Sequence, residues 1–456
     1  MPIKARGCTA ALAFAIAAGT TGQAHAATEL ELLRKQVQLL EQRLQELEQK
    51  EAENTEKIEE TAEKADRAEE ALETEVVKSG GSLGTFVLPG TDTRITIGGY
   101  AKGDFIYDFG GSIGSDDLFV PETIVIGGEN DPKFTAHARQ SRVNIRTTSP
   151  SSFGPVKTLI EGDFFGVGGN EVISNSFSFR LRHAWGELGP LAGGQFWTNF
   201  MPIEAYPTTV DFQGPAGIPF IRQAQLRWTQ PVTDNFTVIG SLENSEFSGQ
   251  AVDPADPTGP LISVSESIAP ALEGLEAGID VAPDAVLTGI YRDDFGLVRA
   301  SGVARYFGNQ GTADGGTFGW GFNVGANLNV TDSTKLLLSG TGGEGVGRYI
   351  INGFGLDGVI GLDGEIDPIG AYGVTAQLQQ KLTESVTGAV AYGRYEVLDT
   401  FSPTEVETLQ TVHGSLFWTP VDRVTLGAEI IFGMIEDQSG ADDNAVRLQT
   451  SVQVNF

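Results

Sequence analysis

The chain contains almost no cysteine and, beyond its first residues, no long apolar run. Its one cysteine, Cys8, lies near the start of 456 residues, so disulfides and thiolate metal sites are excluded in the mature chain. After residue 27 there is no run of about eighteen apolar residues, the length that a membrane-spanning helix needs. We therefore expect no such helix in the mature protein.

Positive charge is also scarce. The sequence has 30 lysines and arginines against 60 aspartates and glutamates, which gives a formal net charge of −30 at pH 7. This balance excludes nucleic acid as a partner, because binding to phosphates needs a basic face. The hydrophobic content of 40% and the 59 glycines fit neither a helical membrane protein nor a disordered chain.

Residues 1–26 have the parts of a secretory signal peptide. Lys4 and Arg6 precede the short apolar run 10–18, and Ala24–Ala26 offers an A-x-A cleavage site. Cleavage there would remove both bases and change the net charge from −30 to −32. An uncleaved membrane anchor is the alternative, but the apolar run is short for it. We therefore expect an exported protein.

Residues 27–78 predict an α-helical coiled coil. Apolar residues recur there at steps of three and four with no proline or glycine, and this register is typical of coiled coils. The first core positions are Leu30, Leu33, Val37, Leu40, Leu44 and Leu47. A solvated single helix is the alternative. Neither form can bury the apolar stripe within one chain, so we expect an oligomer, and the heptads do not decide between two and three strands.

Residues 79–93 form a predicted linker. The run Lys78–Ser82, which contains two glycines and two serines, ends the helix and has the composition of a flexible hinge. From Arg94 onward the pattern changes to short alternating runs separated by Gly, Pro, Asn and Asp. This change places the start of a β-domain at Arg94.

Residues 94–456 predict an all-β transmembrane barrel. Apolar and polar residues alternate along 318–330, 424–434 and 446–456, and a period of two puts them on opposite faces of a sheet. An apolar outer face with a polar inner face is typical of outer-membrane barrels. Such a sheet must close, because its edges cannot be hydrogen-bonded in lipid. A soluble β-sandwich is the alternative, but it would not need so uniform a division of faces.

Sixteen antiparallel strands are predicted, an even number as in single-chain bacterial barrels. They are placed at 94–107, 133–148, 155–166, 176–188, 191–199, 219–230, 234–244, 285–292, 295–307, 318–330, 333–341, 371–382, 385–396, 408–419, 423–434 and 444–456. Long and tight connections alternate, which puts the loops outside the cell and the turns in the periplasm. Both ends of the barrel, and with them the coiled coil, then lie on the periplasmic side. A barrel of this size leaves an aqueous lumen, which indicates a channel.

The stretch 133–228 carries an unusual surplus of positive charge, nine bases against six acids. Its seven arginines lie on the second, fourth and sixth predicted strands: Arg139, Arg142, Arg146, Arg180, Arg182, Arg222 and Arg227. An outward arginine at the bilayer midplane would cost about 2–4 kcal/mol, so we predict that all seven line the pore. Rings of arginine select anions, and the guanidinium fork suits carboxylates.

Two questions about these arginines stay open in the sequence. Arg139 and Arg142 have opposite parity, so a bulge near Gln140 is needed to bring both to the same face. The alternative to anion selection is that the arginines are neutralised by lumenal acids such as Glu161 and Asp163.

Three loops bear on the same question. Loop 200–218, with five residues that are proline or glycine, leaves a strand beside the arginines. Its place suits inward folding that would narrow the pore, but its sequence does not establish this. Loops 108–132 and 245–284 hold six and eight acids and no base. An acidic mouth of this kind would repel bulky anions at long range.

Other motifs predict no chemistry. Gly340–Gly345 matches a nucleotide-binding glycine pattern in its letters, but no helix follows it. Asp363–Asp367 could supply carboxylates to Ca²⁺, although an acidic loop tip is the simpler interpretation. His413 and Ser415 share an inward position, yet a nucleophile needs a base oriented by a third group, and none is evident. We expect no enzyme activity, no cofactor and no metal.

Several short motifs resemble those of a known family. They are His137–Arg142, Glu161–Phe165, Arg180–Trp185, Gly194–Trp197, Asp211–Pro215 and Ile221–Arg222. With the leader, the coiled coil and the sixteen-stranded barrel, the chain from Glu29 to Phe456 resembles the DcaP-like trimeric outer-membrane porins. The resemblance implies trimers and diffusive uptake of small negatively charged solutes, including dicarboxylates. The acidic outer loops depart from it and leave the selectivity open.

The sequence thus predicts an outer-membrane porin that passes small hydrophilic solutes, preferably carboxylates, along the seven arginines. Its expected partners are outer-membrane lipid and other copies of the chain. Two alternatives remain: a structural tether that joins the outer membrane to periplasmic material, and a general porin without selectivity.

Overall fold

The structure is a computed structural model that describes residues 24–75, 78–79, 84–110, 113–129, 131–252, 261–265, 280–308, 316–353, 356–399 and 401–456. The chain divides into two compact units, Met1–Val76 and Val77–Phe456. Residues 1–23, which hold most of the predicted signal peptide, lie outside the described residues.

The first unit is a single helix, α1 (Ala24–Glu75). It runs without interruption because it contains no proline or glycine. Within the single chain the predicted core positions Val37, Leu40 and Leu44 are exposed, so the apolar stripe is uncovered. Among the described residues, no helix is both long enough and apolar enough to cross a membrane.

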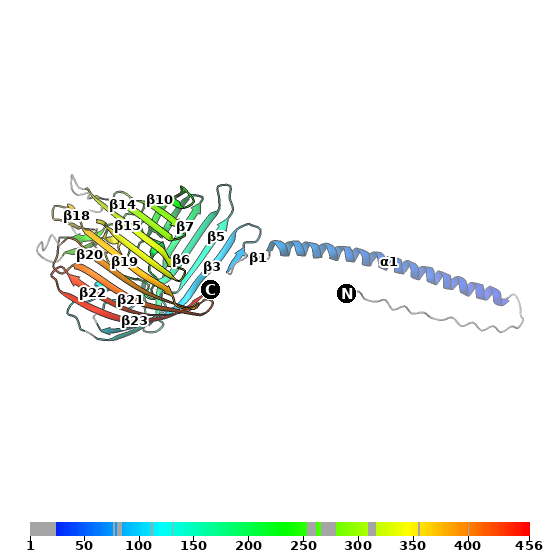
Figure 1. Ribbon diagram of the computed structural model, residues 1–456. Coiled ribbons are helices and arrows are strands. Elements are labelled where there is room, and N and C mark those ends of the chain that lie inside the picture. Colours follow the sequence, from blue (N-terminus) through cyan, green and yellow to red (C-terminus); the bar gives the residue numbers. More distant parts are fainter. Residues whose placement is uncertain are drawn as a thin grey trace. The chain divides into compact units, whose positions relative to one another are not determined.

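The second unit is a closed antiparallel β-barrel of sixteen strands (Figure 1). The ring consists of β3 (Arg94–Gly110), β4 (Lys133–His137), β5 (Arg142–Ser149), β6 (Val156–Asn170), β7 (Ser176–Leu188), β8 (Leu191–Trp197), β9 (Arg222–Pro231), β10 (Phe236–Glu243), β13 (Asp284–Asp293), β14 (Gly296–Gly308), β15 (Gly316–Thr331), β16 (Thr334–Glu344), β19 (Gly370–Lys381), β20 (Val386–Val397), β21 (Val406–Val421), β22 (Val424–Asp437) and β23 (Asp442–Asn455). Here β4 and β5 are one interrupted strand. All sixteen predicted strands are confirmed.

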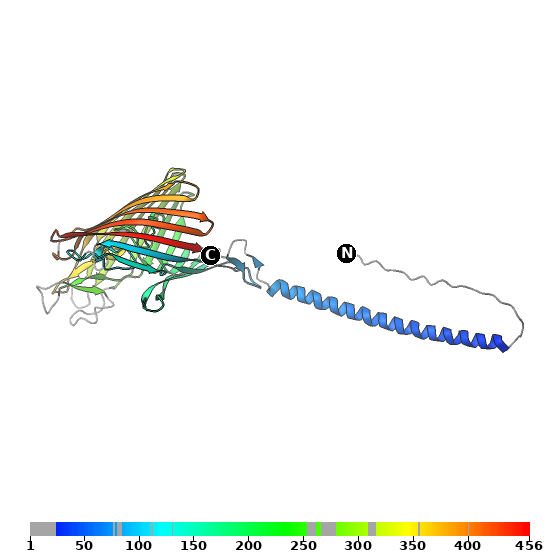
Figure 2. The ribbon, with the colours of Figure 1, turned by 90° about the horizontal axis from the view of Figure 1, so that it is seen from below.

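The ring closes between its last and first strands. β23 pairs with β3 from Tyr100 opposite Asn455 to Gly110 opposite Val446, and Figure 2 shows the two strands side by side. This pairing joins the first and last strands of the sheet, whose outer edges would otherwise be free, as a barrel requires.

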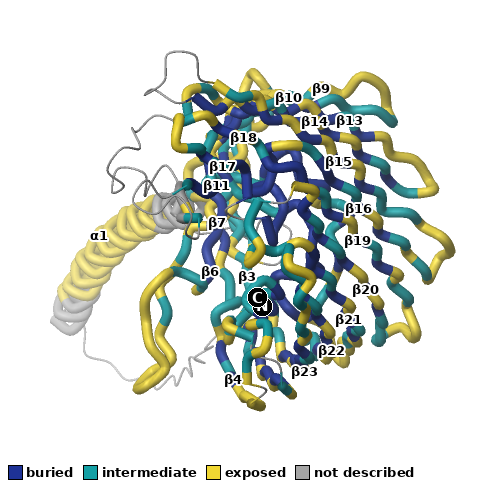
Figure 3. The backbone as a smooth tube through the Cα atoms, turned by 90° about the vertical axis from the view of Figure 1, so that its left-hand side faces the viewer, coloured by how far each residue is buried: buried dark blue, intermediate teal, exposed yellow. Residues whose placement is uncertain are grey.

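The predicted division of faces is confirmed along most strands. In β23, Arg447 and Gln449 are buried inside the barrel while Leu448 and Val452 are exposed outside. The same alternation of buried and exposed residues is visible along β15, β16 and β19 in Figure 3. The exposed side chains are mainly aliphatic and aromatic, as a lipid-facing surface requires.

Part of the inner face is apolar, which differs from the uniformly polar face that we predicted. Phe119 and Ile350, from two long loops, pack against inward side chains of the wall such as Tyr395, Leu409 and Ile431. The two loops fill this side of the barrel because their apolar residues need an apolar wall to cover them. Two cavities lie elsewhere in the barrel and are lined by residues of β5–β9 and of the loop that follows β8.

Short strands outside the ring were not predicted. β1 (Lys78–Ser79) pairs with β2 (Thr85–Val87), and β2 pairs with β3, so part of the predicted linker is in a sheet. Segments of the long loops form a separate four-stranded sheet of β11 (Ser248–Ala251), β12 (Ile262–Ser265), β17 (Gly358–Ile360) and β18 (Ile366–Pro368).

Candidate functional site: a loop facing arginines inside the barrel

Residues 198–221, which we call the lumen loop, fold into the barrel instead of projecting from it. The loop lies directly against the wall at positions that face the lumen and are occupied by glycine. A Cβ atom on Gly427 would come within 2.8 Å of Val210, and one on Gly373 or Gly393 would meet the loop backbone at Gly217 or Ala216. These wall positions therefore require glycine, because any side chain there would displace the loop.

Two charged side chains hold the loop at Val210, and we call them the clamp. The buried carboxylate of Glu429 accepts hydrogen bonds from the backbone N–H groups of Val210, at 2.6 Å, and Asp211, at 3.3 Å. From the other side the Lys102 ammonium donates to the carbonyl of Val210 at 2.9 Å and forms an ion pair with Asp104 at 2.9 Å. Hydrogen bonds to charged groups are about twice as strong as neutral ones, so the clamp fixes where the loop stands.

Asp211 links the loop to its surroundings through backbone donors. Its carboxylate accepts hydrogen bonds from the N–H groups of Phe119, Gln213 and Gly214 at 3.0–3.1 Å. Burial, with a further contribution from the nearby Glu429 carboxylate, raises the pKa of Asp211 to about 6. The group therefore loses its charge in mildly acidic solution.

We predict that any preference of the pore for anions will increase as the pH is lowered from 7.5 to 5. Protonation of Asp211 removes one negative charge from a cavity that it lines, a change of about two- to fourfold in the anion-to-cation permeability ratio at water-like dielectric. Zero-current potentials at the two pH values measure this. In Asp211→Asn the response should shrink, and a full response there would contradict the assignment.

Glu122→Gln is the matched control for this titration. Burial raises the pKa of Glu122 to about 7, where it accepts a hydrogen bond from Asn352. The group therefore titrates over the same pH range, but it does not line the cavity that Asp211 lines. The response to pH should persist in this variant.

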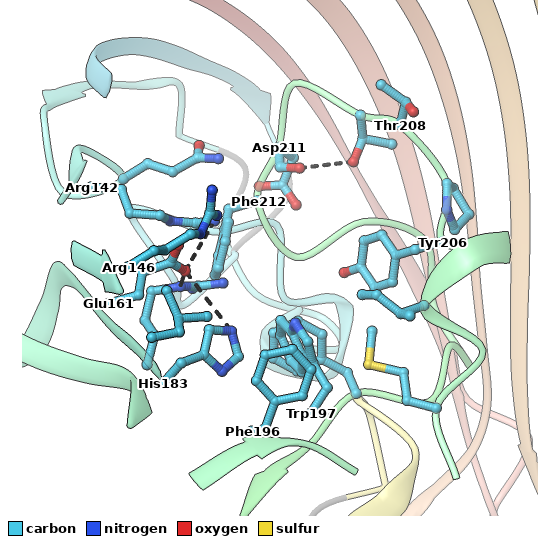
Figure 4. Close-up of a pocket in the computed structure, with 18 residues that line it drawn as sticks. Arg142, Arg146, Glu161, His183, Phe196, Trp197, Tyr206, Thr208, Asp211 and Phe212 are labelled. Atoms are coloured by element: carbon cyan, nitrogen blue, oxygen red, sulfur yellow. Dashed lines mark hydrogen bonds and ion pairs between the residues drawn. The ribbon is translucent and has the colours of Figure 1, made fainter. Parts of the chain in front are cut away.

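Five of the seven predicted arginines line one of two neighbouring cavities between the wall and the lumen loop. Cavity A, of about 400 Å³, is lined by Arg142, Arg146 and Arg182. Cavity B, of about 350 Å³, is lined by Arg180 and Arg222. The remaining two, Arg139 and Arg227, line neither cavity. In Figure 4, Arg142 and Arg146 stand on the opposite side of cavity A from Tyr206 and Thr208 of the lumen loop.

Acidic side chains neutralise part of this arginine cluster. Asp163 is fully buried and binds Arg180 through two hydrogen bonds, at 3.0 and 2.9 Å, and Arg182 through one at 2.9 Å. Glu161 binds Arg182 at 2.8 Å and lies 3.5 Å from Arg142. These pairs fix the guanidinium groups in place and reduce the charge that they present.

Three of the seven have no carboxylate within ion-pair distance among the described residues: Arg146, Arg222 and Arg227. Arg139 pairs with Asp117, whereas Arg227 binds the amide oxygen of Gln225 and a backbone carbonyl. The Nη1 group of Arg222 is buried and has no hydrogen-bond partner in the described part of the chain. Four of the seven guanidinium groups are thus paired, with three carboxylates, those of Asp117, Glu161 and Asp163.

The bulge expected near Gln140 is present as a break between β4 and β5. His137 lies opposite Asp104 and Arg142 lies opposite Tyr100, so the interrupted strand contains one residue more than β3 over this interval. Ser141 donates to the carbonyl of Ala138 in the turn. The extra residue brings both segments into phase, as predicted.

A second irregularity, which the sequence analysis missed, places His183 inside the barrel. Between β6 and β7 the register shifts so that Glu161 faces His183 and Gly162 faces Leu181. Arg182 and His183 therefore both point inward and are buried. His183 packs against Phe196, with ring centroids 4.5 Å apart. Strict alternation assigns His183 to lipid, so only the polar nature of its side chain could have indicated the bulge.

Buried arginines on other strands were also missed. Arg305 on β14 forms ion pairs with Asp284 at 3.1 Å and Asp357 at 2.9 Å, and Arg447 on β23 pairs with Asp108 at 2.6 Å. Their inward parity was readable in the sequence. Because each is paired and fully buried, we assign them to holding loops and strands together.

His413 and Ser415 do not form a hydrolytic site. Both bind the same carboxylate, with His413 Nδ1 at 3.0 Å from Glu429 and the Ser415 hydroxyl donating to it at 2.6 Å. The histidine has no contact with the serine hydroxyl that would let it act as a base. The two side chains orient Glu429, which belongs to the clamp.

The comparisons with known proteins agree with the fold and identify the family. Residues 68–455 match the porin subfamily, while no curated protein matches the sequence. Among solved structures, the chain is similar to the outer membrane channel DcaP of Acinetobacter baumannii, with 20% identity, a TM-score of 0.66, and coverage of 80% of this chain and 97% of that one. It is also similar to an anion-selective porin from Comamonas acidovorans, with 13% identity, a TM-score of 0.50, and coverage of 80% and 100%.

These matches confirm the resemblance inferred from the motifs and the strand pattern. The family and the channels among the structural neighbours indicate a channel of the outer membrane and not an enzyme. The chain belongs to the porin subfamily.

Proposed function

We propose that the protein passes small anionic organic solutes by diffusion between the lumen loop and the arginine cluster. One observation carries the proposal: five arginines line the two cavities, and only two carboxylates, Glu161 and Asp163, form ion pairs with them among the described residues. The unpaired guanidinium groups of Arg146 and Arg222 each line a cavity. Positive groups at a narrow point attract anions and repel cations.

The acidity of the whole chain does not oppose this proposal. Its net charge of −30 is spread over the helix, the long loops and the barrel, and exposed charges are screened over about 8 Å at physiological salt. Guanidinium groups that border a cavity act on a solute at much shorter range. The Comamonas neighbour is described as anion-selective, which is in keeping with the proposal.

We further propose that the mature chain begins after Ala26 and assembles as a trimer, with α1 forming a periplasmic coiled coil. The uncovered apolar stripe of α1, which includes Leu40, Leu44 and Leu47, supports self-association, because a second helix would remove it from water. The trimer itself rests on the resemblance to DcaP-like porins.

Solute efflux from proteoliposomes tests the proposed function. Vesicles would be loaded with a linear dicarboxylate, a diamine or a diol of the same chain length. We expect the dicarboxylate to leave fastest and the diamine slowest, because length is constant and charge alone differs. Equal rates for all three would support a general porin. Efflux no faster than from loaded vesicles without the protein would support a structural tether. Either result would contradict the proposal.

A further inference from the structure

Two aromatic rings separate the cavities. Phe212 and Phe220 are shared by the linings of cavity A and cavity B, and their centroids lie 6.3 Å apart with the rings perpendicular. Figure 4 shows Phe212 standing between Arg142 on one side and Tyr206 on the other. The two cavities that the arginines line thus share these two apolar groups.

Both rings are held in place. Phe212 stacks on Phe165 at 5.2 Å with an angle of 16° between the rings, and it lies in the turn that Asp211 fixes. Phe220 packs on Trp197 at 4.8 Å, and its N–H donates to the carbonyl of Tyr349. Rings with such contacts keep their positions while a solute passes.

Guanidinium groups flank the rings from both cavities. On the side of cavity A, Arg182 and Arg142 lie 5.2 and 5.9 Å from the centroid of Phe212. On the side of cavity B, Arg222 lies 5.9 Å from the centroid of Phe220. Each cavity therefore offers its own positive groups, and the two residues common to both linings are the aromatic rings. A carboxylate finds charged donors in either cavity, whereas the rings offer it none.

We propose that Phe212 and Phe220 form a septum between two anion subsites in series, and that the septum selects organic anions with a narrow apolar body. The inference rests on the proposed function and adds that the shape of the solute, as well as its charge, determines whether it passes. A carboxylate would move from Arg180 and Arg222 in cavity B to Arg142 and Arg182 in cavity A. A narrow body slides between the rings during this step, while a branched body collides with them.

Ion substitution in planar bilayers tests the septum. Replacing chloride on one side with acetate, and then with the branched pivalate, gives the permeability ratio of pivalate to acetate. In Phe212→Ala we expect this ratio to rise about fivefold or more, because the variant removes a steric overlap of the kind that costs about 1–3 kcal/mol in a packed core. The sign of charge selectivity should not change. Phe220→Ala is a second, independent variant. Only folded channels give conductance steps, so the measurement selects folded protein.

Phe153→Ala is the matched control, because Phe153 is an exposed residue of a tight turn and its removal should leave the ratio unchanged. A rise in either septum variant would support the proposal, and an unchanged ratio in both would overturn it. Swelling of vesicles in linear and branched neutral polyols distinguishes failure of the septum from failure of the proposed function. If the wild type prefers cations, the proposed function fails, whereas the septum is still judged by whether Phe212→Ala admits the branched polyol.

Discussion

Replacing Arg146 and Arg222 together with serine is expected to remove most of the preference for anions. These two residues combine the features on which the proposed selectivity depends, since each lines a cavity and neither has a carboxylate within ion-pair distance among the described residues. The charges of Arg180 and Arg182, in contrast, are balanced in part by Asp163.

The size of the effect follows from Coulomb's law. A unit charge at about 5 Å stabilises a monovalent anion by about 0.8 kcal/mol in water-like surroundings and by about 3 kcal/mol at an effective dielectric constant of 20. Removal of two such charges should lower the anion-to-cation permeability ratio by about tenfold or more. Zero-current potentials at low salt measure this ratio without much screening.

A neutral pair provides the control for the arginine variant. Arg139 binds Asp117, so Arg139→Gln combined with Asp117→Asn removes two charged groups and leaves the net charge unchanged. We expect this double variant to keep the wild-type ratio. If it lost selectivity as strongly as Arg146→Ser/Arg222→Ser, the distinction between paired and unpaired arginines would be wrong.

Replacing Glu429 with alanine is expected to release the lumen loop and increase single-channel conductance. The change removes the acceptor of the N–H groups of Val210 and Asp211, and each buried donor left without an acceptor costs about 1–3 kcal/mol. The barrel itself should persist, because β22 keeps its hydrogen bonds to β21 and β23. The lost free energy therefore destabilises the position of the loop and not the barrel.

Thiol labelling reports the same release independently of current. The sequence contains a single cysteine, Cys8, within the predicted leader, so Thr209→Cys would introduce a unique thiol in the mature chain. Its rate of reaction with a water-soluble reagent should increase in Glu429→Ala and increase less in Glu429→Gln, whose amide oxygen still accepts one bond. Glu436→Ala, on the same strand, is the control. Wild-type conductance and reactivity in Glu429→Ala would show that the clamp does not hold the loop.

The strands of the barrel were predictable because lipid and water impose a two-residue period on each of them. That period places Arg447 inside and Leu448 outside with no information beyond the sequence. It fails where the register slips, as at His183, because a bulge depends on the partner strand as well as on the bulged one. The period does place Ile431 on the inner face, but it does not foresee an apolar residue there, which is explained by the loop that covers it.

The arrangement of the site was less predictable than its residues. The arginines were found from their charge and parity, but which of them Glu161 and Asp163 neutralise depends on distances across strands. Inward folding of the lumen loop left a signal in the glycines at the polar positions of distant strands, such as Gly373 and Gly427. Only the folded chain shows that these glycines face the loop.

The zero-current potential of the wild-type channel across a potassium chloride gradient tests the central claim most directly. The proposed attraction of anions by unpaired guanidinium groups predicts a potential of the sign that greater chloride permeability produces, with a magnitude that declines as salt is raised. A potential of the opposite sign would show that potassium passes more readily. That result would contradict the assignment of the arginine cluster as the selective wall of the pore.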